Sequence, residues 1–241
     1  MNNILITGVT SGIGFDLASR LLKYSDYIIW GIGRNEDKIS NLKEYSNFRF
    51  LKFDLNNIEL YEDFFAECFD KIKFNGFVHC AGIEETIPLL LQKPDATNTI
   101  FKINLFSAVE LLRIISKKKY SVDGASFIFI SSVMGKLGQP GKVGYCSTKA
   151  AILGMVRAAA LELSKRKIRV NAISPGIVDT PLTQKLFSKL DEESIQKIIN
   201  MHPLGIGAPN KISPLIEFLL NNDSSWITGQ NIVVDGGYSI Q

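Results

Sequence analysis

The sequence is poor in the residues that build metal sites and disulfide frameworks. It contains two histidines, His79 and His202, and three widely spaced cysteines, Cys68, Cys80 and Cys146. Two histidines are too few for a histidine-based metal centre, and the cysteines have neither zinc-site spacing nor an even number. We therefore expect reduced thiols, no metal and no disulfide framework.

The chain also lacks a long apolar segment and a strong excess of charge of one sign. No apolar run reaches the roughly 18 residues that indicate a membrane span. The N-terminus enters an apolar stretch without the charged start and cleavage site of a signal peptide. The formal net charge is +3, and no basic stripe is interleaved with aromatic residues. These absences predict a cytoplasmic protein that binds neither membranes nor nucleic acid.

Short apolar runs alternate with segments of helical periodicity along the 241 residues. The runs typical of strands are 3–7, 27–32, 48–53, 76–80, 125–131, 168–173 and 232–234. The helical segments are 15–24, 57–72, 99–116, 145–166, 183–201 and 214–220. This alternation predicts one α/β domain over residues 1–241. We expect this domain to be of the Rossmann type, with a doubly wound parallel sheet of about seven strands. Helices would cover both faces of the sheet, and a ligand crevice would lie at the carboxyl ends of the strands.

A glycine-rich turn follows the first expected strand and precedes the first expected helix. It holds Gly8, Gly12 and Gly14. Glycine allows positive φ and a close approach of the backbone, and a helix N-terminus attracts a pyrophosphate. A plain strand–helix turn is the alternative, but the flanking strand and helix favour dinucleotide binding.

The residue that recognises the adenosine ribose is expected about 20 residues beyond the glycines. Counting from Gly14 leads to Gly33 and Arg34, and no acid stands there to bind a ribose 2′-hydroxyl. An arginine suits a 2′-phosphate by charge and by bidentate geometry. NADP(H) is thus favoured, and NAD(H) is the second choice. The alternative is a surface arginine at the start of a helix that Asn35 caps.

Other candidate contacts follow the third and fourth strands. Asp54 either accepts a hydrogen bond from an adenine amino group or caps the next helix. The small residues Ala81 and Gly82 would let a ribose approach the backbone. We expect His79 and Cys80 to pack rather than to catalyse.

The chemistry is expected between the fifth strand and the helix that follows it. Tyr145 and Lys149 are one helical turn apart and share a face, and Ser132 ends the strand. A free phenol has a pKa of about 10, and a nearby ammonium should lower that pKa towards neutrality. Tyr145 would then exchange a proton with a carbinol oxygen that Ser132 hydrogen-bonds. The alternative is a tyrosine and a lysine on an ordinary helix, because this spacing alone is a weak signal.

One polar residue, Asn104, lies in the apolar helix 99–116. A buried amide needs partners. It is either a satisfied core amide or the holder of a water next to Lys149.

Taken together, these segments resemble the short-chain dehydrogenase/reductase family over nearly the whole chain. The turn from Thr7 to Gly14 is similar to the family's TGxxxGxG motif, and Asp54-Leu55 matches its adenine-side aspartate. The quartet Asn104, Ser132, Tyr145 and Lys149 matches its catalytic tetrad, and the segment from Pro175 to Thr180 resembles its PGxxxT motif. Residues 227–237 are similar to the last strand of 3-oxoacyl-carrier-protein reductase-like members.

The resemblance implies a role for each matched residue. Tyr145 is the proton donor or acceptor, Lys149 lowers its pKa and binds the nicotinamide ribose, Ser132 holds the substrate oxygen, and Asn104 anchors a relay water. The backbone of Ile177 meets the carboxamide. The expected cofactor-binding residues are Gly8, Thr10, Ser11, Gly12, Ile13, Gly14, Arg34, Asp54, Leu55, Cys80, Ala81, Gly82, Tyr145, Lys149, Pro175, Gly176, Ile177 and Thr180.

One departure from the family pattern concerns the central strand. His79-Cys80-Ala81-Gly82 stands where the family has NNAG, so two side-chain amides that brace this strand are missing. The departure questions the local bracing more than the chemistry, because the family contacts the cofactor here largely through the backbone.

The substrate is the open point of the sequence. The specificity surface is expected at 84–94, 133–144 and 182–202, with a mobile lid near 182–202. The resemblance favours an NADP(H)-dependent oxidoreductase acting on a carbonyl or secondary alcohol, with a 3-oxoacyl thioester on a carrier as first choice. A sugar or other small ketone is the alternative, and so is a non-catalytic dinucleotide-binding sensor. The family also implies a homotetramer or homodimer built through the two long helices and the last strand.

Overall fold

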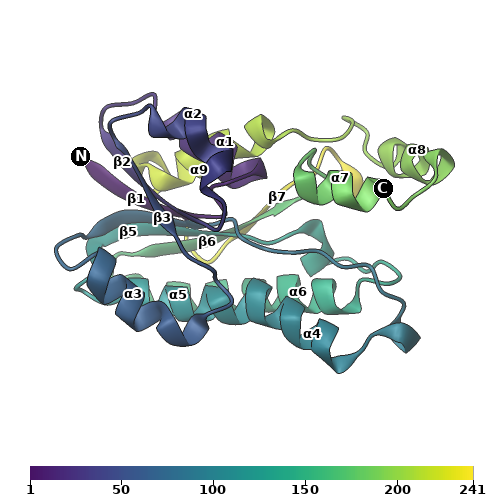
Figure 1. The fold of residues 1–241 in the computed structure, drawn as a ribbon, viewed down its shortest axis with the longest axis horizontal. Helices are drawn as coiled ribbons and strands as arrows, with labels where there is room; N and C mark the ends of the chain where they lie inside the picture. The colour runs from purple at the N-terminus through teal and green to yellow at the C-terminus, as the bar shows by residue number, and fades with distance from the viewer. Residues whose placement is uncertain (241) are drawn as a thin grey trace.

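A seven-stranded parallel sheet forms the centre of the molecule (Figure 1). The structure, a computed structural model, describes residues 1–240. The strand order is β3-β2-β1-β4-β5-β6-β7. The strands are β1 Asn2–Thr7, β2 Tyr27–Gly33, β3 Phe48–Lys52, β4 Phe74–His79, β5 Ser121–Ile130, β6 Arg169–Pro175 and β7 Asn231–Val234. The order reverses between β1 and β4, where α/β folds of this kind bind their ligands. The expected α/β fold is confirmed.

Helices cover both faces of the sheet (Figure 1). One face carries α1, α2 and α9, and the other carries α3, α4, α5 and α6. The bounds are α1 Gly12–Leu21, α2 Ser40–Lys43, α3 Tyr61–Cys68, α4 Pro94–Phe101, α5 Ser107–Ile115, α6 Val143–Leu163, α7 Pro181–Phe187, α8 Glu192–Asn200 and α9 Pro209–Leu220. Helices α7 and α8 lie beyond the carboxyl ends of the strands, on the side of α1 and α9.

Two apolar cores lie on opposite faces of the sheet because successive side chains of a strand point to opposite sides. On β5, Phe127 and Phe129 enter the core beneath α3, α5 and α6, whereas Ile128 and Ile130 enter the core beneath α1 and α9. Buried phenylalanines dominate the first core, and aliphatic side chains fill the second. Strands buried on both faces explain the nearly continuous apolar runs in the sequence.

The expected single helix over 183–201 is wrong. The structure has two helices, α7 and α8, separated by residues 188–191. The Asp191 carboxylate accepts a hydrogen bond from the Ser194 N–H at 2.7 Å and caps α8. Thr180 caps α7 in the same way, with Thr183 as the donor. Helical periodicity continued across the break, whereas the capping side chain at Asp191 marks the new start.

Other helix boundaries also differ from the expected ones. The helix around Asn104 begins at Pro94, and it contains a π-helical turn over Lys102–Phe106 between α4 and α5. The expected helix 57–72 is a short 3₁₀ turn at Ile58–Leu60 followed by α3. Helix α9 begins five residues before Pro214, which it tolerates in its second turn. In the described residues, no helix is long and apolar enough to cross a bilayer.

Candidate active site

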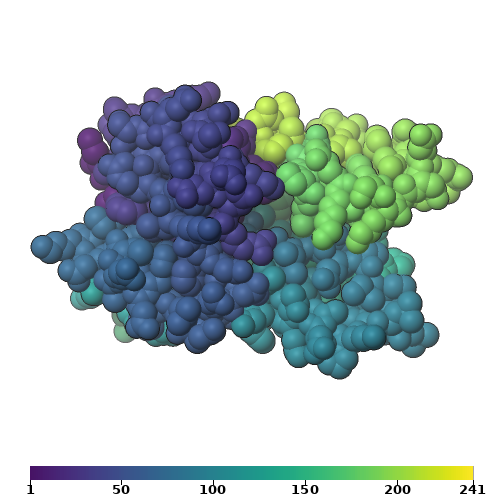
Figure 2. Space-filling model, in the orientation of Figure 1, coloured from purple at the N-terminus to yellow at the C-terminus, as the bar shows by residue number. Residues whose placement is uncertain are grey.

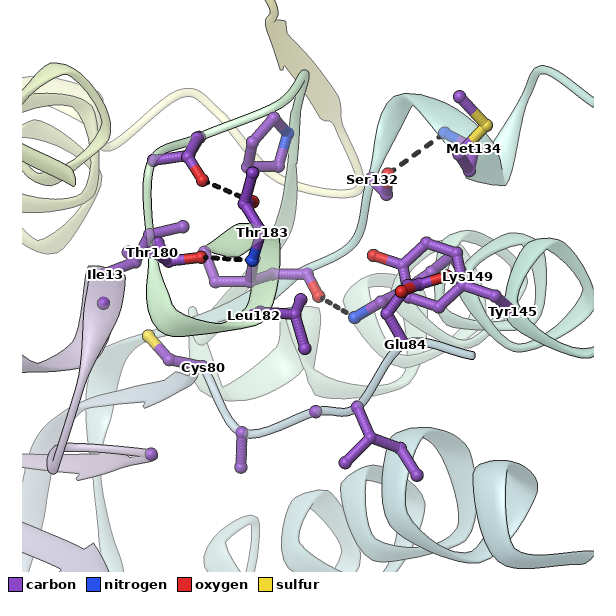
Figure 3. A pocket seen from close by; sticks show the side chains of 18 of the residues that line it. Ile13, Cys80, Glu84, Ser132, Met134, Tyr145, Lys149, Thr180, Leu182 and Thr183 are labelled. Atoms are coloured by element: carbon purple, nitrogen blue, oxygen red, sulfur yellow. Dashed lines mark hydrogen bonds between the residues drawn. The ribbon is translucent and has the colours of Figure 1, made fainter. Parts of the chain in front are cut away.

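One cavity of about 620 Å³ opens at the carboxyl ends of the strands. Every residue predicted to bind the cofactor lines this cavity, and so do Ser132, Tyr145 and Lys149 of the predicted catalytic quartet. Asn104 is not among the lining residues. Segments at the ends of six strands, β1 to β6, therefore meet around one space, part of which Figure 3 shows.

The glycine turn is packed so closely that a side chain at Gly8 or Gly14 would collide with main-chain atoms. Gly8 has a φ of +71°, and a Cβ there would lie 2.8 Å from the main-chain nitrogen of Ala81. A Cβ on Gly14, in the first turn of α1, would lie 2.5 Å from the carbonyl oxygen of Gly8. The turn therefore holds β1, α1 and the end of β4 in close contact, as a backbone cradle for phosphates requires. These residues fit a dinucleotide.

Among the cavity residues, Arg34 is exposed, and its side chain has no hydrogen bond or ion pair among residues 1–240. Asn35 caps the short helix Glu36–Ile39 by accepting from the Asp37 N–H at 2.9 Å. The guanidinium is therefore free, while its neighbour does the capping. Asp54 accepts a hydrogen bond from the Asn56 N–H at 3.0 Å and also lines the cavity, so it serves the local turn.

The predicted catalytic residues converge from β5 and α6 (Figure 3). Lys149 is 5 % exposed, and its Nζ donates to the carbonyl oxygen of Ile130 at 2.8 Å. The same Nζ lies 5.7 Å from the centre of the Tyr145 ring. Ser132, buried at the start of a 3₁₀ turn, accepts from the Met134 N–H at 3.1 Å, and its hydroxyl also interacts with the Tyr145 phenol. The three side chains thus border one space, in the arrangement that proton transfer to a carbonyl oxygen needs.

The pKa of Tyr145 runs against the expected direction. The pKa of the phenol is raised to about 12, chiefly by burial; a hydrogen bond with Ser132 acts to lower this pKa, and the Glu84 carboxylate acts to raise it. Burial also lowers the pKa of Lys149 to about 8, because a charged ammonium loses hydration there. The prediction that Lys149 makes the phenol acidic is therefore wrong for the unliganded chain. Loss of hydration is the largest influence on the phenol, and Tyr145 is protonated at neutral pH.

Asn104 is a satisfied core amide. Its Oδ1 accepts from the Ile83 N–H at 2.8 Å, and its Nδ2 donates to the Ile83 carbonyl at 2.9 Å and to Thr148 Oγ1 at 3.2 Å. The residue is fully buried inside the π-helical turn. It ties the segment after β4 to α6, and a Cβ on Gly82 beside it would lie 3.3 Å from its Oδ1.

His79 supplies a brace at the place where the family's amides are missing. Its Nδ1 shares a hydrogen bond of 2.9 Å with Thr7 Oγ1, which joins β4 to β1. Its ring packs beside Phe77 and Phe129, and burial lowers its pKa to about 3, so the ring is neutral. The sequence prediction that His79 packs is confirmed. Cys80 instead lines the cavity, and burial raises the pKa of its thiol to about 12.

Two rings at the cavity, His202 and Tyr238, form a pair that the sequence did not predict. His202, which follows α8, accepts from the Ile177 N–H at 3.4 Å through Nε2 and bonds the Ile198 carbonyl at 2.8 Å through Nδ1. Its ring stacks on Tyr238 with 4.7 Å between ring centres. These contacts fasten the end of α8 to the segment after β6. No spacing rule relates the two rings, so the sequence carried no signal for the pair.

One part of the cavity wall is largely apolar. It is formed by Ile103, Val133, Met134, Leu182, Leu186 and Ile198. Helices α7 and α8 supply the upper part of this wall, and Figure 2 shows their green segment lying over the blue-green segment of α4 across a crease. Of the expected specificity segments, 133–144 and 182–202 each line the cavity with several residues, whereas 84–94 lines it only with Glu84. In residues 1–240, no cluster of three or more histidine, cysteine, aspartate or glutamate side chains is suited to a metal ion.

Comparison with known proteins identifies the family to which the chain belongs. A family model described as enoyl-(acyl carrier protein) reductase matches residues 8–239. The chain belongs to the short-chain dehydrogenase/reductase family. Members act on hydroxyl and carbonyl groups, and the chain is an oxidoreductase of this kind.

Individual relatives match over almost their full length. The chain is 32 % identical to a 3-oxoacyl-[acyl-carrier-protein] reductase of Thermotoga maritima, covering 98 % of this chain and 97 % of that protein. A solved structure of 4-hydroxyisoleucine dehydrogenase complexed with NADH has a TM-score of 0.92 and 28 % identity, with complete coverage of both chains. A structure of ElxO with NADP bound has a TM-score of 0.83 and 30 % identity, covering 100 % of this chain and 99 % of that one. The fold therefore accommodates either dinucleotide.

Proposed function

We propose that this chain is a cytoplasmic NADP(H)-dependent reductase that moves a hydride between the nicotinamide of a bound cofactor and a carbonyl or secondary alcohol. Its main support is the shared cavity. The glycine turn and a free Arg34 guanidinium border the adenosine end, and Ser132, Tyr145 and Lys149 border the other end. An uncompensated guanidinium beside a dinucleotide cradle suits a 2′-phosphate by charge and geometry.

In this proposal the protonated phenol is the working form for reduction. When bound, the nicotinamide supplies the hydride to the carbonyl carbon. Tyr145 donates its proton to the carbonyl oxygen, and the product is a secondary alcohol. Ser132 donates a hydrogen bond to the same oxygen, and the Lys149 ammonium stabilises the phenolate that Tyr145 leaves behind. A raised pKa of Tyr145 supports this direction, because the donor is then fully loaded at neutral pH.

A 3-oxoacyl thioester, free or bound to a carrier, is the proposed substrate class. Two features support it: the apolar wall built by Met134, Leu182, Leu186 and their neighbours, and the 3-oxoacyl-[acyl-carrier-protein] reductase activity of the Thermotoga relative. The segment 182–202 is the proposed substrate lid of a single domain. Exposed apolar side chains on the helical face, Phe106, Val109 and Leu161, support a homodimer or homotetramer built through α5 and α6.

The function is tested by giving the purified chain a panel of carbonyl compounds at fixed NADPH and then at fixed NADH. The panel contains a 3-oxoacyl thioester, a keto sugar and small ketones. We expect NADPH consumption, fastest with the 3-oxoacyl thioester. Tight NADPH binding without consumption across the panel would contradict an enzyme and favour a dinucleotide sensor. A faster rate with the keto sugar or small ketone would replace the proposed substrate class.

A further inference from the structure

A buried ion pair joins two segments that border the proposed active site. Lys142, just before α6, donates from Nζ to the Glu84 carboxylate and, at 3.0 Å, to Thr86 Oγ1. Thr86 in turn donates to the same Glu84 oxygen at 2.8 Å. The side chains of Lys142 and Glu84 are only 6 % and 11 % exposed, so both charges have been taken largely out of water. Removing either partner would leave the other charge buried and unpaired.

This pair lies against the ring of Tyr145. The Lys142 Nζ is 5.8 Å from the ring centre, almost the same distance as the Lys149 Nζ at 5.7 Å. Two ammonium groups thus approach one phenol. Their partners differ, because Lys142 contacts a carboxylate whereas Lys149 contacts a neutral main-chain carbonyl. Figure 3 shows the Glu84 side chain beside those of Tyr145 and Lys149.

Polar and titratable groups face Tyr145 from each element packed around it. They are Lys149 and Cys146 on α6, Lys142 before α6, Glu84 and Glu85 after β4, and Ser132 after β5. After the larger effect of burial, the Glu84 carboxylate acts to raise the pKa of the phenol. The charge on Glu84 therefore reaches Tyr145 as well as Lys142.

We propose that Glu84 is a positioning residue that acts through Lys142: it neutralises this second ammonium and so makes the Tyr145 phenol harder to ionise. Without Glu84, the Lys142 ammonium would lie uncompensated beside the ring and would favour phenolate. The inference rests on the proposed reductase function, in which Tyr145 is the proton donor.

The test uses Glu84→Gln and Lys142→Met, each also combined with Tyr145→Phe. Glutamine keeps an acceptor for Lys142 and Thr86 but removes the charge. The phenolate absorbance of each protein is titrated with pH, and subtracting the Tyr145→Phe partner isolates Tyr145 from the other tyrosines. Glu84→Gln should lower the pH at which Tyr145 ionises by about one unit or more. Lys142→Met should not lower the pH at which Tyr145 ionises. A variant with both Glu84→Gln and Lys142→Met should ionise Tyr145 at a pH between those of the two single variants.

Both single variants break the contact between Glu84 and Lys142. A purely structural role of this contact would give the same shift in the ionisation of Tyr145 in both variants, whereas a role of the Glu84 charge lowers the ionisation pH only in Glu84→Gln. An unchanged ionisation in Glu84→Gln, or an equal downward shift in both variants, would overturn the inference. Asp70→Asn is the matched control, because it removes a carboxylate from an exposed ion pair with Lys119, in the segments that precede β4 and β5. It should leave Tyr145 unaffected. Since the titration needs no turnover, it separates failure of this inference from failure of the reductase proposal, which the carbonyl panel reports.

Discussion

The Nζ atom of Lys149 donates a 2.8 Å hydrogen bond to the main-chain carbonyl of Ile130. The last residue of β5 therefore fixes the ammonium at the edge of the cavity, one helical turn from Tyr145. Ser131, the next residue in the chain, donates to the Lys149 carbonyl at 2.9 Å, which holds α6 against the same strand end. The position of the cation is thus set by the sheet before any ligand is bound.

The lowered pKa of Lys149 predicts a pH dependence. The ammonium is present below its pKa of about 8 and is lost above it, so its support of the Tyr145 phenolate disappears as pH rises. For carbonyl reduction, kcat/KM for NADPH should therefore fall above about pH 8, because this ratio reports groups of the free enzyme. Lys149→Arg, which stays charged, should lose this fall even if its rate is lower. A flat profile for the wild type through pH 9 would contradict the assignment.

The free guanidinium of Arg34 predicts the choice of cofactor. Arg34→Ala should raise KM for NADPH at least about tenfold, because the substitution removes a charge-assisted contact to the 2′-phosphate. KM for NADH should change little. Arg34→Lys is the matched control, and it should keep part of the preference because it keeps the charge. An unchanged ratio of the two KM values in Arg34→Ala would rule out this role.

The hydrogen bonds of Asn104 predict that replacing this residue lowers the stability of the fold. Asn104→Ala would leave the partly buried main-chain groups of Ile83 and the buried Thr148 hydroxyl without this partner, at up to about 1–3 kcal/mol for each unsatisfied group. We expect the free energy of unfolding to fall by about 2–4 kcal/mol, measured by urea denaturation. Asn98→Ala, an exposed position on α4, should change it by less than about 0.5 kcal/mol. Equal effects of the two substitutions would mean that the Ile83 contacts add no stability.

The close packing around Gly14 predicts that a side chain at this position weakens cofactor binding. In Gly14→Ala the new Cβ would meet the Gly8 carbonyl oxygen at 2.5 Å, so the turn must shift. NADPH binding, followed by fluorescence titration, should weaken at least about tenfold, since the phosphate cradle depends on this backbone. Gly154→Ala is the control, because no atom lies within 4 Å of a Cβ built there. Comparable binding by the two variants would contradict the cradle.

The sequence predicted the sheet and the convergence of the site well, because most of the cavity segments stand at the end of a buried strand. Gly8, Arg34, Ser132 and Pro175 could be placed on one rim from parallel-strand topology alone. Periodicity could not show that Asp191 restarts a helix, since a cap depends on local hydrogen bonds. The π-helical turn that directs Asn104 towards Ile83 likewise depends on tertiary contacts.

The electrostatics could not be predicted from spacing. The sequence placed Lys149 beside Tyr145 but gave no measure of how much water the fold removes from the phenol, and this loss of hydration decides its pKa. The contact between Glu84 and Lys142, 58 positions apart, and the stacking of His202 on Tyr238 are long-range contacts without a motif.

The most direct test of the account is the effect of Tyr145→Phe on carbonyl reduction, with NADPH binding measured on the same protein. We expect the variant to bind NADPH about as tightly as the wild type, because the glycine turn and Arg34 are untouched. Its kcat should fall by at least about a hundredfold, as expected for loss of a positioned proton donor. Equal rates for the two proteins would contradict the assignment of Tyr145 and the catalytic mechanism built on it.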